Sequence, residues 1–239
     1  MNYKKKIRVF FDNYFKKGYA NQQLIYDSHK LKNLFPNGFF YPETDWSLSS
    51  SFIVDALNTI LIKDSKFIVE FGSGISTFYI AKLLQVYNLK TKFISIESNL
   101  DWANKQRNWL KCQNLDNFVT IIDAPLTNVS SVNSYKSQRT WYSEKILYDI
   151  LTNLPPIDLV LVDGPFGESS PYSRYSAVPF LKDFLAEDFT IFLDDTIRKQ
   201  EYEISQVWSD QILIKPLYNE RYCKFSKSNF FESNPKNLN

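Results

Sequence analysis

The sequence predicts an α/β fold built on an open, mostly parallel sheet, and three observations support this prediction. Short apolar runs typical of strands alternate with segments of helical spacing, in five strand-to-helix steps along the 239 residues. One run, residues 157–162, is almost continuously apolar, which indicates a strand covered on both faces. Several runs end in an acidic residue or a glycine turn, as expected where parallel strands present their carboxyl ends at one edge.

The first predicted strand, residues 67–71, leads into a glycine turn and then a helix. Gly72 and Gly74 have no Cβ, so the backbone of this turn is able to approach a bound nucleoside closely. The dinucleotide fingerprint G-x-G-x-x-G needs a third glycine where this chain has Thr77. The turn therefore indicates a nucleoside site of another kind, and a tight turn without any ligand is the alternative that this motif leaves open.

Acidic residues end the next two predicted strands. Glu97 closes residues 92–97, about 20 residues after the glycines, where a carboxylate is able to accept both hydroxyl hydrogens of a ribose. Asp123 closes residues 118–123. Because neighbouring parallel strands share one carboxyl edge, we expect these acids to lie around a single crevice.

The remaining elements follow from periodicity and from turn residues. Pro155 and Pro156 end a helix ahead of the strand at residues 157–162. That helix is residues 141–154. The other helices predicted from residue spacing are 47–62, the segment from 102 to 110, 174–186 and 200–208. A last strand at residues 189–193, loops at 126–140 and 167–173, and a hairpin of residues 211–217 with 221–225 complete the prediction.

Composition favours one large domain with an N-terminal extension. The chain is 44% hydrophobic and 17% aromatic, enough for a sizeable core. Its 28 Lys and Arg residues against 26 Asp and Glu residues give a net charge of +2, so no broad basic surface favours nucleic acid. Cys112 and Cys223 have neither disulfide-framework nor zinc-site spacing. With no apolar run near the ~20 residues that span a bilayer and no signal peptide, we expect a cytoplasmic protein.

Residues 1–45 form the predicted extension, residues 46–228 the main domain, and residues 229–239 a loose polar tail. Lysines and aromatic residues interleave over residues 4–17, and two interpretations stay open for this helix. It lies in a membrane interface, or it packs on the main domain with its lysines in solvent. The aromatic segment that ends at Trp46 is a candidate lid, and His29, the single histidine, is either a general base or structural.

Motifs of the chain resemble class I S-adenosylmethionine-dependent methyltransferases over residues 47–226. Residues 69–74 resemble the family's first motif, Glu97 its ribose-binding acid, and residues 163–165 its fourth motif. The resemblance implies a Rossmann-like seven-stranded sheet with helices on both faces and an antiparallel C-terminal hairpin. It also implies S-adenosylmethionine as cofactor. The implied cofactor-binding residues are Glu70, Gly72, Ser73, Gly74, Thr77, Glu97, Asp123, Ala124 and Asp163.

A narrower set of motifs is similar to bacterial O-methyltransferases associated with sugars and surface glycans. These motifs are residues 72–77, Trp141 with Tyr142, residues 162–165, Arg174 with Tyr175, and residues 193–198. They imply a small-molecule or glycan acceptor that is methylated on a hydroxyl. The catechol and macrolide-sugar O-methyltransferases resemble the chain in the spacing of three acids, which there hold magnesium. Phe166 replaces the catalytic lysine of the catechol enzymes, which excludes a lysine base at that point.

The candidate catalytic residues are Asp163, Asp195 and Arg174. All-oxygen ligands suit Mg²⁺, which Asp163, Asp194 and Asp195 would hold. The bound cation would lower the pKa of an acceptor hydroxyl. Without a metal, an aspartate acts as general base, and Arg174 or Arg198 orients the acceptor or a carboxylate or phosphate on it. Two alternatives concern structure: Asp194 and Asp195 cap the following helix, and Glu70 binds backbone amides of the glycine turn.

We therefore expect a methyltransferase that uses S-adenosylmethionine. One alternative is an oxidoreductase that uses NAD(P), which Thr77 and the missing Tyr-x-x-x-Lys pair disfavour. The other is a catalytically silent domain of the same fold that binds a partner. The sequence predicts neither the acceptor's identity nor an oligomeric state.

Overall fold

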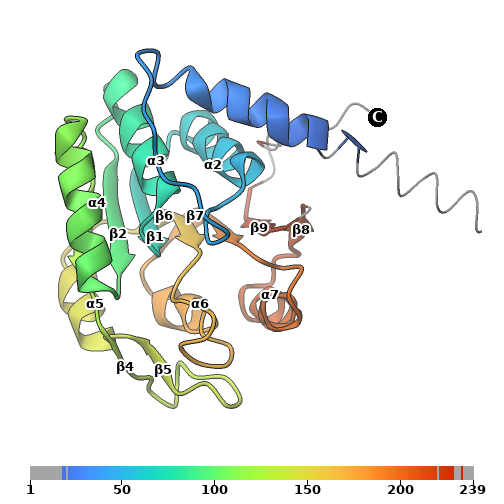
Figure 1. The fold of residues 1–239 in the computed structure, drawn as a ribbon. Coiled ribbons are helices and arrows are strands. Elements are labelled where there is room, and N and C mark those ends of the chain that lie inside the picture. Colours follow the sequence, from blue (N-terminus) through green and yellow to red (C-terminus); the bar gives the residue numbers. More distant parts are fainter. Residues whose placement is uncertain (1–17, 20, 220, 229–232, 234–239) are drawn as a thin grey trace, which may run out of the picture.

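The computed structural model describes residues 18–19, 21–219, 221–228 and 233. At its centre is a seven-stranded sheet in the order β3-β2-β1-β6-β7-β9-β8 (Figure 1). The strands are β1 (Phe67–Phe71), β2 (Lys92–Glu97), β3 (Thr120–Asp123), β6 (Ile157–Val162), β7 (Leu185–Leu193), β8 (Leu217–Tyr218) and β9 (Cys223–Ser226). The first five in the sheet order are parallel, whereas β9 runs antiparallel to β7 and to β8. This topology confirms the predicted Rossmann-like sheet with its antiparallel C-terminal hairpin.

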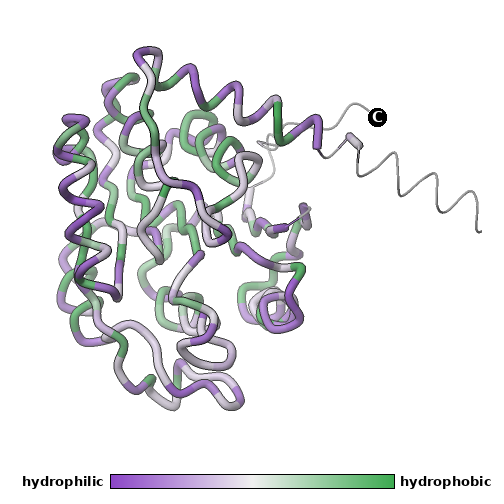
Figure 2. Tube along the Cα trace, in the orientation of Figure 1, coloured by the Kyte–Doolittle hydropathy of each residue, from purple (hydrophilic) through white to green (hydrophobic). Residues whose placement is uncertain are grey.

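Three helices cover each face of the sheet. The alternation of side chains in the strands sets these faces: Ile68 packs with α2, α3 and α4, whereas Phe67 and Val69 pack with α5, α6 and α7. The six helices are α2 (Ser50–Lys63), α3 (Ile75–Val86), α4 (Leu100–Cys112), α5 (Glu144–Leu151), α6 (Ala177–Leu181) and α7 (Lys199–Ile212). Hydrophobic residues therefore concentrate in the central strands, and the outer turns of α4 are hydrophilic (Figure 2). β1 and β6 are almost entirely buried between the two helical layers, whereas the outer strand β3 is partly exposed.

The strand order reverses between β1 and β6, because the chain first builds outward through β2 and β3 and then returns to the other side of β1. The pairing register aligns Phe71 with Val162, and Val162 with Leu193. Glu97 is likewise aligned with Asp123. The loops after β1, β2, β3, β6 and β7 therefore open at one edge, where open α/β sheets bind their ligands.

The segment after β3 differs from the prediction. The expected loop of residues 126–140 begins and ends in a separate antiparallel hairpin, β4 (Leu126–Asn128) with β5 (Thr140–Tyr142) (Figure 1). Trp141 and Tyr142, predicted as helix, lie in β5 and are buried. The two strands are only three residues long and residues 129–139 separate them, so neither shows a period that identifies it before its partner is known.

The helix predicted over residues 174–186 is also shorter than expected. It spans Ala177–Leu181, and β7 begins at Leu185, four residues ahead of the predicted strand. The backbone N–H of Ile157 donates to the carbonyl oxygen of Phe184, so pairing with β6 draws these residues into the sheet. Tertiary pairing here overrides local helical spacing.

The part of the N-terminal extension that is described packs on the main domain. Residues 21–32 are helical, and Asp27 accepts a hydrogen bond of 2.6 Å from Ser51 Oγ of α2. The following segment runs along α3 (Figure 1), where Phe39 stacks on Phe78 with 5.4 Å between ring centroids. His29 is exposed on the helix. The predicted basic helix of residues 4–17 and most of the tail lie outside the described residues.

Within the described ranges, none of the helices has the length and apolar content needed to cross a bilayer.

Candidate functional site

The glycine turn after β1 uses its two glycines differently. Gly72 has a φ of +93°, and a Cβ built on it would lie 3.0 Å from the backbone nitrogen of Gly164, in the loop after β6. A Cβ on Gly164 would lie 2.9 Å from Gly72 Cα and 2.2 Å from Tyr142 Oη. A Cβ on Gly74, in contrast, meets no atom within 4 Å. The expectation that Gly72 leaves room for a ligand is therefore corrected: Gly72 leaves room for another loop, and the open space lies at Gly74.

Glu70 is buried beneath the glycine turn and stabilises it through hydrogen bonds. Its carboxylate is fully buried and accepts hydrogen bonds from Ser76 Oγ at 2.5 Å, Thr77 Oγ1 at 2.5 Å and Ser95 Oγ at 2.6 Å. Thr77 Oγ1 also accepts a bond of 2.9 Å from the backbone N–H of Gly74. Burial raises the pKa of Glu70 to about 7, although the three hydroxyl donors oppose the shift. The partners of Glu70 are hydroxyl groups rather than the backbone amides of the alternative interpretation.

Glu97 reaches the turn from β2. Its Oε2 accepts hydrogen bonds of 3.1 Å from both the backbone N–H and the hydroxyl of Ser73. Its Oε1 accepts bonds of 2.8 Å from the N–H groups of Ser98 and Asn99, which lead into α4. The predicted ribose-binding acid is thus adjacent to the glycine turn, and uncharged donors hold it there.

Asp123 lies beside Glu97 on the neighbouring strand. Its Oδ1 is 2.6 Å from Arg107 Nη2 of α4, and its side chain is 44% exposed. The N–H of Ala124 donates to the carbonyl oxygen of Glu97 at 2.8 Å. The structure therefore brings the predicted cofactor residues of β1, β2 and β3 to one edge, although the side chains of Glu70 and Thr77 are completely buried below it.

Three aspartates gather at the ends of β6 and β7. One carboxylate oxygen from each of Asp163, Asp194 and Asp195 lies within 4.8 Å of the others. Asp194 is completely buried, and its Oδ1 has no hydrogen-bond partner among the described residues. Burial raises the pKa of Asp194 to about 6, with a further contribution from the charge of Asp195. Burial likewise raises the pKa of Asp163 well above its usual range, and the Arg174 guanidinium opposes that shift.

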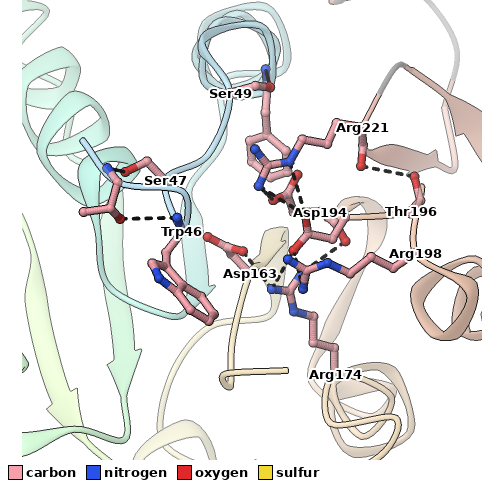
Figure 3. A network of polar contacts seen from close by, with 12 residues as sticks. Trp46, Ser47, Ser49, Asp163, Arg174, Asp194, Thr196, Arg198 and Arg221 are labelled. Carbon is pink, nitrogen blue, oxygen red and sulfur yellow. Dashed lines mark hydrogen bonds and ion pairs between the residues drawn. The ribbon is translucent and has the colours of Figure 1, made fainter. Parts of the chain in front are cut away.

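Three arginines converge on these aspartates (Figure 3). Arg174 Nη2 lies 3.1 Å from Asp163 Oδ1 and 3.2 Å from Asp195 Oδ2. Arg198 Nη1 lies 3.0 Å from the same Asp195 oxygen. The ion pairs of Arg221 Nη2 are with Asp194 Oδ2 at 3.2 Å and Asp195 Oδ1 at 3.1 Å. Three negative and three positive side chains thus form one cluster with no net formal charge.

Arg221 is the site residue that sequence reasoning missed. It lies next to β9, and only the antiparallel pairing of Leu193 with Cys223 brings it to the end of β7. The alternative that Asp194 and Asp195 cap the following helix is wrong. The N-cap of α7 is Arg198, and no side-chain hydrogen bond caps this end of the helix. Asp195 instead has a φ of +62°, a conformation that turns the chain sharply after β7.

The cluster does not fit a divalent cation as it stands. Carboxylate oxygens are suitable ligands for Mg²⁺, which binds them at about 2.0–2.1 Å. Here, however, guanidinium nitrogens lie within ion-pair distance of all three carboxylates. A cation among them would face three positive side chains at short range.

An aromatic pair lies near the cluster. Trp46 and Phe166 are in contact, with 4.3 Å between ring centroids, and their residues are 56% and 44% exposed. Phe166 is three residues after Asp163 in the loop that follows β6, so the pair lies near this end of the strand. Trp141 and Tyr142, which form one of the motifs similar to glycan O-methyltransferases, are buried core residues.

Comparison with known proteins agrees with this geometry. A family model described as a methyltransferase domain matches residues 69–196, more than half of the chain, from β1 to just past the paired aspartates. No curated protein matches the sequence.

Several solved structures share the fold. An O-methyltransferase from Bacillus cereus in complex with S-adenosylhomocysteine has a TM-score of 0.55 at 12% identity, covering 77% of this chain and 84% of that one. The O-methyltransferase TomG from Streptomyces achromogenes, involved in tomaymycin synthesis and in complex with S-adenosylmethionine, has a TM-score of 0.56 at 10% identity, covering 86% and 89%. The S-adenosylhomocysteine-bound methyltransferase PaMTH1 from Podospora anserina has a TM-score of 0.54 at 15% identity, covering 95% and 97%.

Proposed function

Because the chain belongs to the methyltransferase domain family, we propose that it transfers a methyl group from S-adenosylmethionine to a hydroxyl oxygen of a sugar or glycan precursor. When bound, S-adenosylmethionine supplies a methyl group on a sulfonium, whose carbon–sulfur bond breaks as the new carbon–oxygen bond forms. The protein then has two tasks, which are to hold both molecules at a reactive distance of roughly 3–3.5 Å and to accept the hydroxyl proton.

The observation that carries the proposal is the open space at Gly74 between acidic strand ends. A Cβ there would meet nothing, and α3 begins at the next residue, so the turn leaves room for a nucleoside to approach its backbone. Glu97 lies against the same turn, where it is able to accept ribose hydroxyls, and Asp123 follows on the next strand. The solved relatives from Bacillus cereus and Podospora anserina bind S-adenosylhomocysteine, which supports this assignment.

Asp163 is the proposed acceptor of the hydroxyl proton. Its side chain is 17% exposed, more than the side chains of Asp194 and Asp195, and it ends β6, the strand next to β1. Asp163 therefore lies between the glycine turn and the other two aspartates of the cluster. Arg174, which is only 5% exposed, positions the carboxylates of Asp163 and Asp195 rather than touching the acceptor.

The aromatic pair supports a sugar acceptor. Carbohydrate rings have an apolar face that packs on exposed aromatic side chains, and Trp46 and Phe166 offer such a surface near the end of β6. Arg198, 46% exposed, provides guanidinium N–H donors at the same opening for hydroxyl, carboxylate or phosphate groups. The sequence motifs that resemble those of bacterial glycan O-methyltransferases favour the same class of acceptor.

Magnesium at Asp163, Asp194 and Asp195 stays a prediction from the sequence. Its test is turnover in EDTA, followed by addition of Mg²⁺. Undiminished activity in EDTA would remove it. The ion pairs that the three aspartates form with arginines argue against Mg²⁺ at this cluster.

Isothermal titration with S-adenosylhomocysteine and with NAD⁺ tests the proposed cofactor. We expect binding of S-adenosylhomocysteine alone, and loss of that binding in Gly74→Val, whose side chain fills the open space. Gly18→Val is the matched control, because a Cβ on Gly18 also meets nothing within 4 Å. Binding of NAD⁺ alone would favour an oxidoreductase, and binding of neither would favour a silent domain.

A screen of nucleotide-sugars and short glycans with isotopically labelled methyl donor then tests the acceptor. We expect label in a product that is stable to base, as an ether is. Label only in an ester or an amine would contradict methylation of a hydroxyl.

A further inference from the structure

The three aspartates at the ends of β6 and β7 resemble a cation site in their ligand atoms but not in their surroundings. We propose that the guanidinium of Arg174 takes the place that a divalent cation would have among Asp163, Asp194 and Asp195, so that the cluster works without a metal. This inference deepens the proposed methyl transfer, and its main test is read without turnover.

Arg174 contacts two of the carboxylates and the backbone of the third aspartate. Its Nη2 lies 3.1 Å from Asp163 Oδ1 and 3.2 Å from Asp195 Oδ2, and its Nη1 donates to the backbone carbonyl of Asp194 at 3.1 Å. One planar group therefore bridges the ends of two neighbouring strands. A divalent cation that bridged the same oxygens would have to occupy this position.

Charge gives a second argument. Three carboxylates alone would attract a divalent cation strongly, because their like charges repel one another in a buried site. In this chain three arginines balance the three negative charges: Arg174 pairs with Asp163 and Asp195, Arg198 with Asp195, and Arg221 with Asp194 and Asp195. Adding a divalent cation to the complete cluster would create two excess positive charges at distances of a few ångströms, so binding has no electrostatic driving force.

Burial gives a third argument. The side chain of Arg174 is 5% exposed, and it cannot turn into solvent without a change in the fold. If a metal displaced it, the guanidinium would lose its carboxylate partners while still buried, which is strongly unfavourable. Arg198 and Arg221 are 46% and 30% exposed, so neither is fixed in the same way.

The consequence concerns the orientation of Asp163. Arg174 holds one oxygen of this carboxylate. Arg174 is thus a positioning residue, which acts on the acceptor through Asp163.

Direct metal binding tests the proposal on the wild-type protein. Mn²⁺ is added up to millimolar concentration and free Mn²⁺ is followed by electron paramagnetic resonance. We expect no bound Mn²⁺ at this cluster. Stoichiometric binding that is lost in Asp195→Asn would overturn the proposal, whether or not the protein binds S-adenosylhomocysteine.

Two matched variants distinguish position from charge. Arg174→Gln removes the bridging guanidinium, and we expect it to gain Mn²⁺ binding and an unfolding temperature that Mg²⁺ raises. Arg221→Gln removes one positive charge from Asp194 and Asp195 but leaves Arg174, and we expect it to gain neither. If Arg221→Gln binds Mn²⁺ as strongly as Arg174→Gln does, the assignment to Arg174 is overturned. If Arg174→Gln does not fold, the wild-type measurement decides: absence of binding supports the proposal, and binding lost in Asp195→Asn refutes it.

Discussion

Both halves of the sheet edge carry acidic residues, but the two halves hold them in different ways. On the β1 and β2 side, Glu70 and Glu97 accept hydrogen bonds from hydroxyl and backbone N–H groups. On the β6 and β7 side, Asp163, Asp194 and Asp195 pair with guanidinium groups. Carboxylates at one edge thus have uncharged partners at Glu70 and Glu97 and charged partners at the three aspartates. Asp123, on the outer strand β3, is the exception on the first side, because it pairs with Arg107.

This difference separates two tasks. Uncharged donors fix Glu97 in space without cancelling its charge, so the carboxylate remains a strong acceptor for ligand hydroxyls. Charged partners make the aspartate cluster rigid and neutral, which suits the positioning of an acceptor. The nucleoside half is therefore expected to depend on the charge of single residues, and the acceptor half on the completeness of its ion-pair network.

The largest expected effect is on the network. Arg174→Met leaves Asp163 and Asp195 without a buried partner, and we expect a loss of about 3–5 kcal/mol in the free energy of unfolding. Arg198→Met, a control at the exposed edge of the same cluster, is expected to cost at most about 1 kcal/mol. Urea denaturation measures both values. Equal losses would mean that the buried network has no special stability.

An effect of similar size concerns the contact between the two halves. In Gly164→Ala, the new Cβ would meet Tyr142 Oη and the backbone of Gly72. The backbone is unable to move aside, so we expect a loss of about 3 kcal/mol in the free energy of unfolding. Gly74→Ala, which meets no atom, is expected to cost less than about 1 kcal/mol. Thermal unfolding of both variants measures the difference, and a reversed order would contradict the packing described here.

The uncharged half predicts a pH dependence. The pKa of Glu70 is raised from 4.5 to about 7, so the folded protein binds this proton more tightly than the unfolded chain does. The resulting stability is present below pH ~4.5 and is lost as the pH rises through about 7, a difference of about 3 kcal/mol. Glu70→Gln is neutral throughout, so unfolding free energies at about pH 5 and about pH 8 should differ less in the variant. An unchanged pH profile would contradict a raised pKa at Glu70, because Asp163 and Asp194 contribute to both proteins alike.

The smallest expected effect is on ligand affinity. Glu97→Gln removes the charge at the glycine turn, and we expect S-adenosylhomocysteine to bind about 10–100-fold more weakly. Asp123→Asn is the comparison, because Asp123 is exposed and already paired with Arg107, and its loss is expected to be less than about tenfold. Isothermal titration measures both. A larger loss in Asp123→Asn would reverse the roles assigned to the two acids.

Local sequence patterns were sufficient for the sheet and for most of the site. The strands that end at Glu97 and Val162 were predicted with their correct limits, because a buried parallel strand is a short apolar run with a polar end. The aspartate cluster was predicted from the same rule. Arg221 was not, because its place depends on the pairing of β9 with β7, about 30 residues apart in sequence.

The role of Gly72 was missed for a related reason. A glycine turn is visible in the sequence, but the atoms that approach the glycine belong to Gly164, in a loop that follows several intervening elements. In each case the missing information is which distant segments meet, and local periodicity does not contain it.

The close approach of Gly72 and Gly164 has a consequence for the reaction itself. The two loops, which the proposed function assigns to methyl donor and acceptor, meet here through main-chain atoms, with the hydroxyl of Tyr142 beside them. In that proposal, the peptide backbone sets most of the gap that a methyl group must cross. Selection for a new acceptor is free to change the side chains around the opening while this spacing is kept.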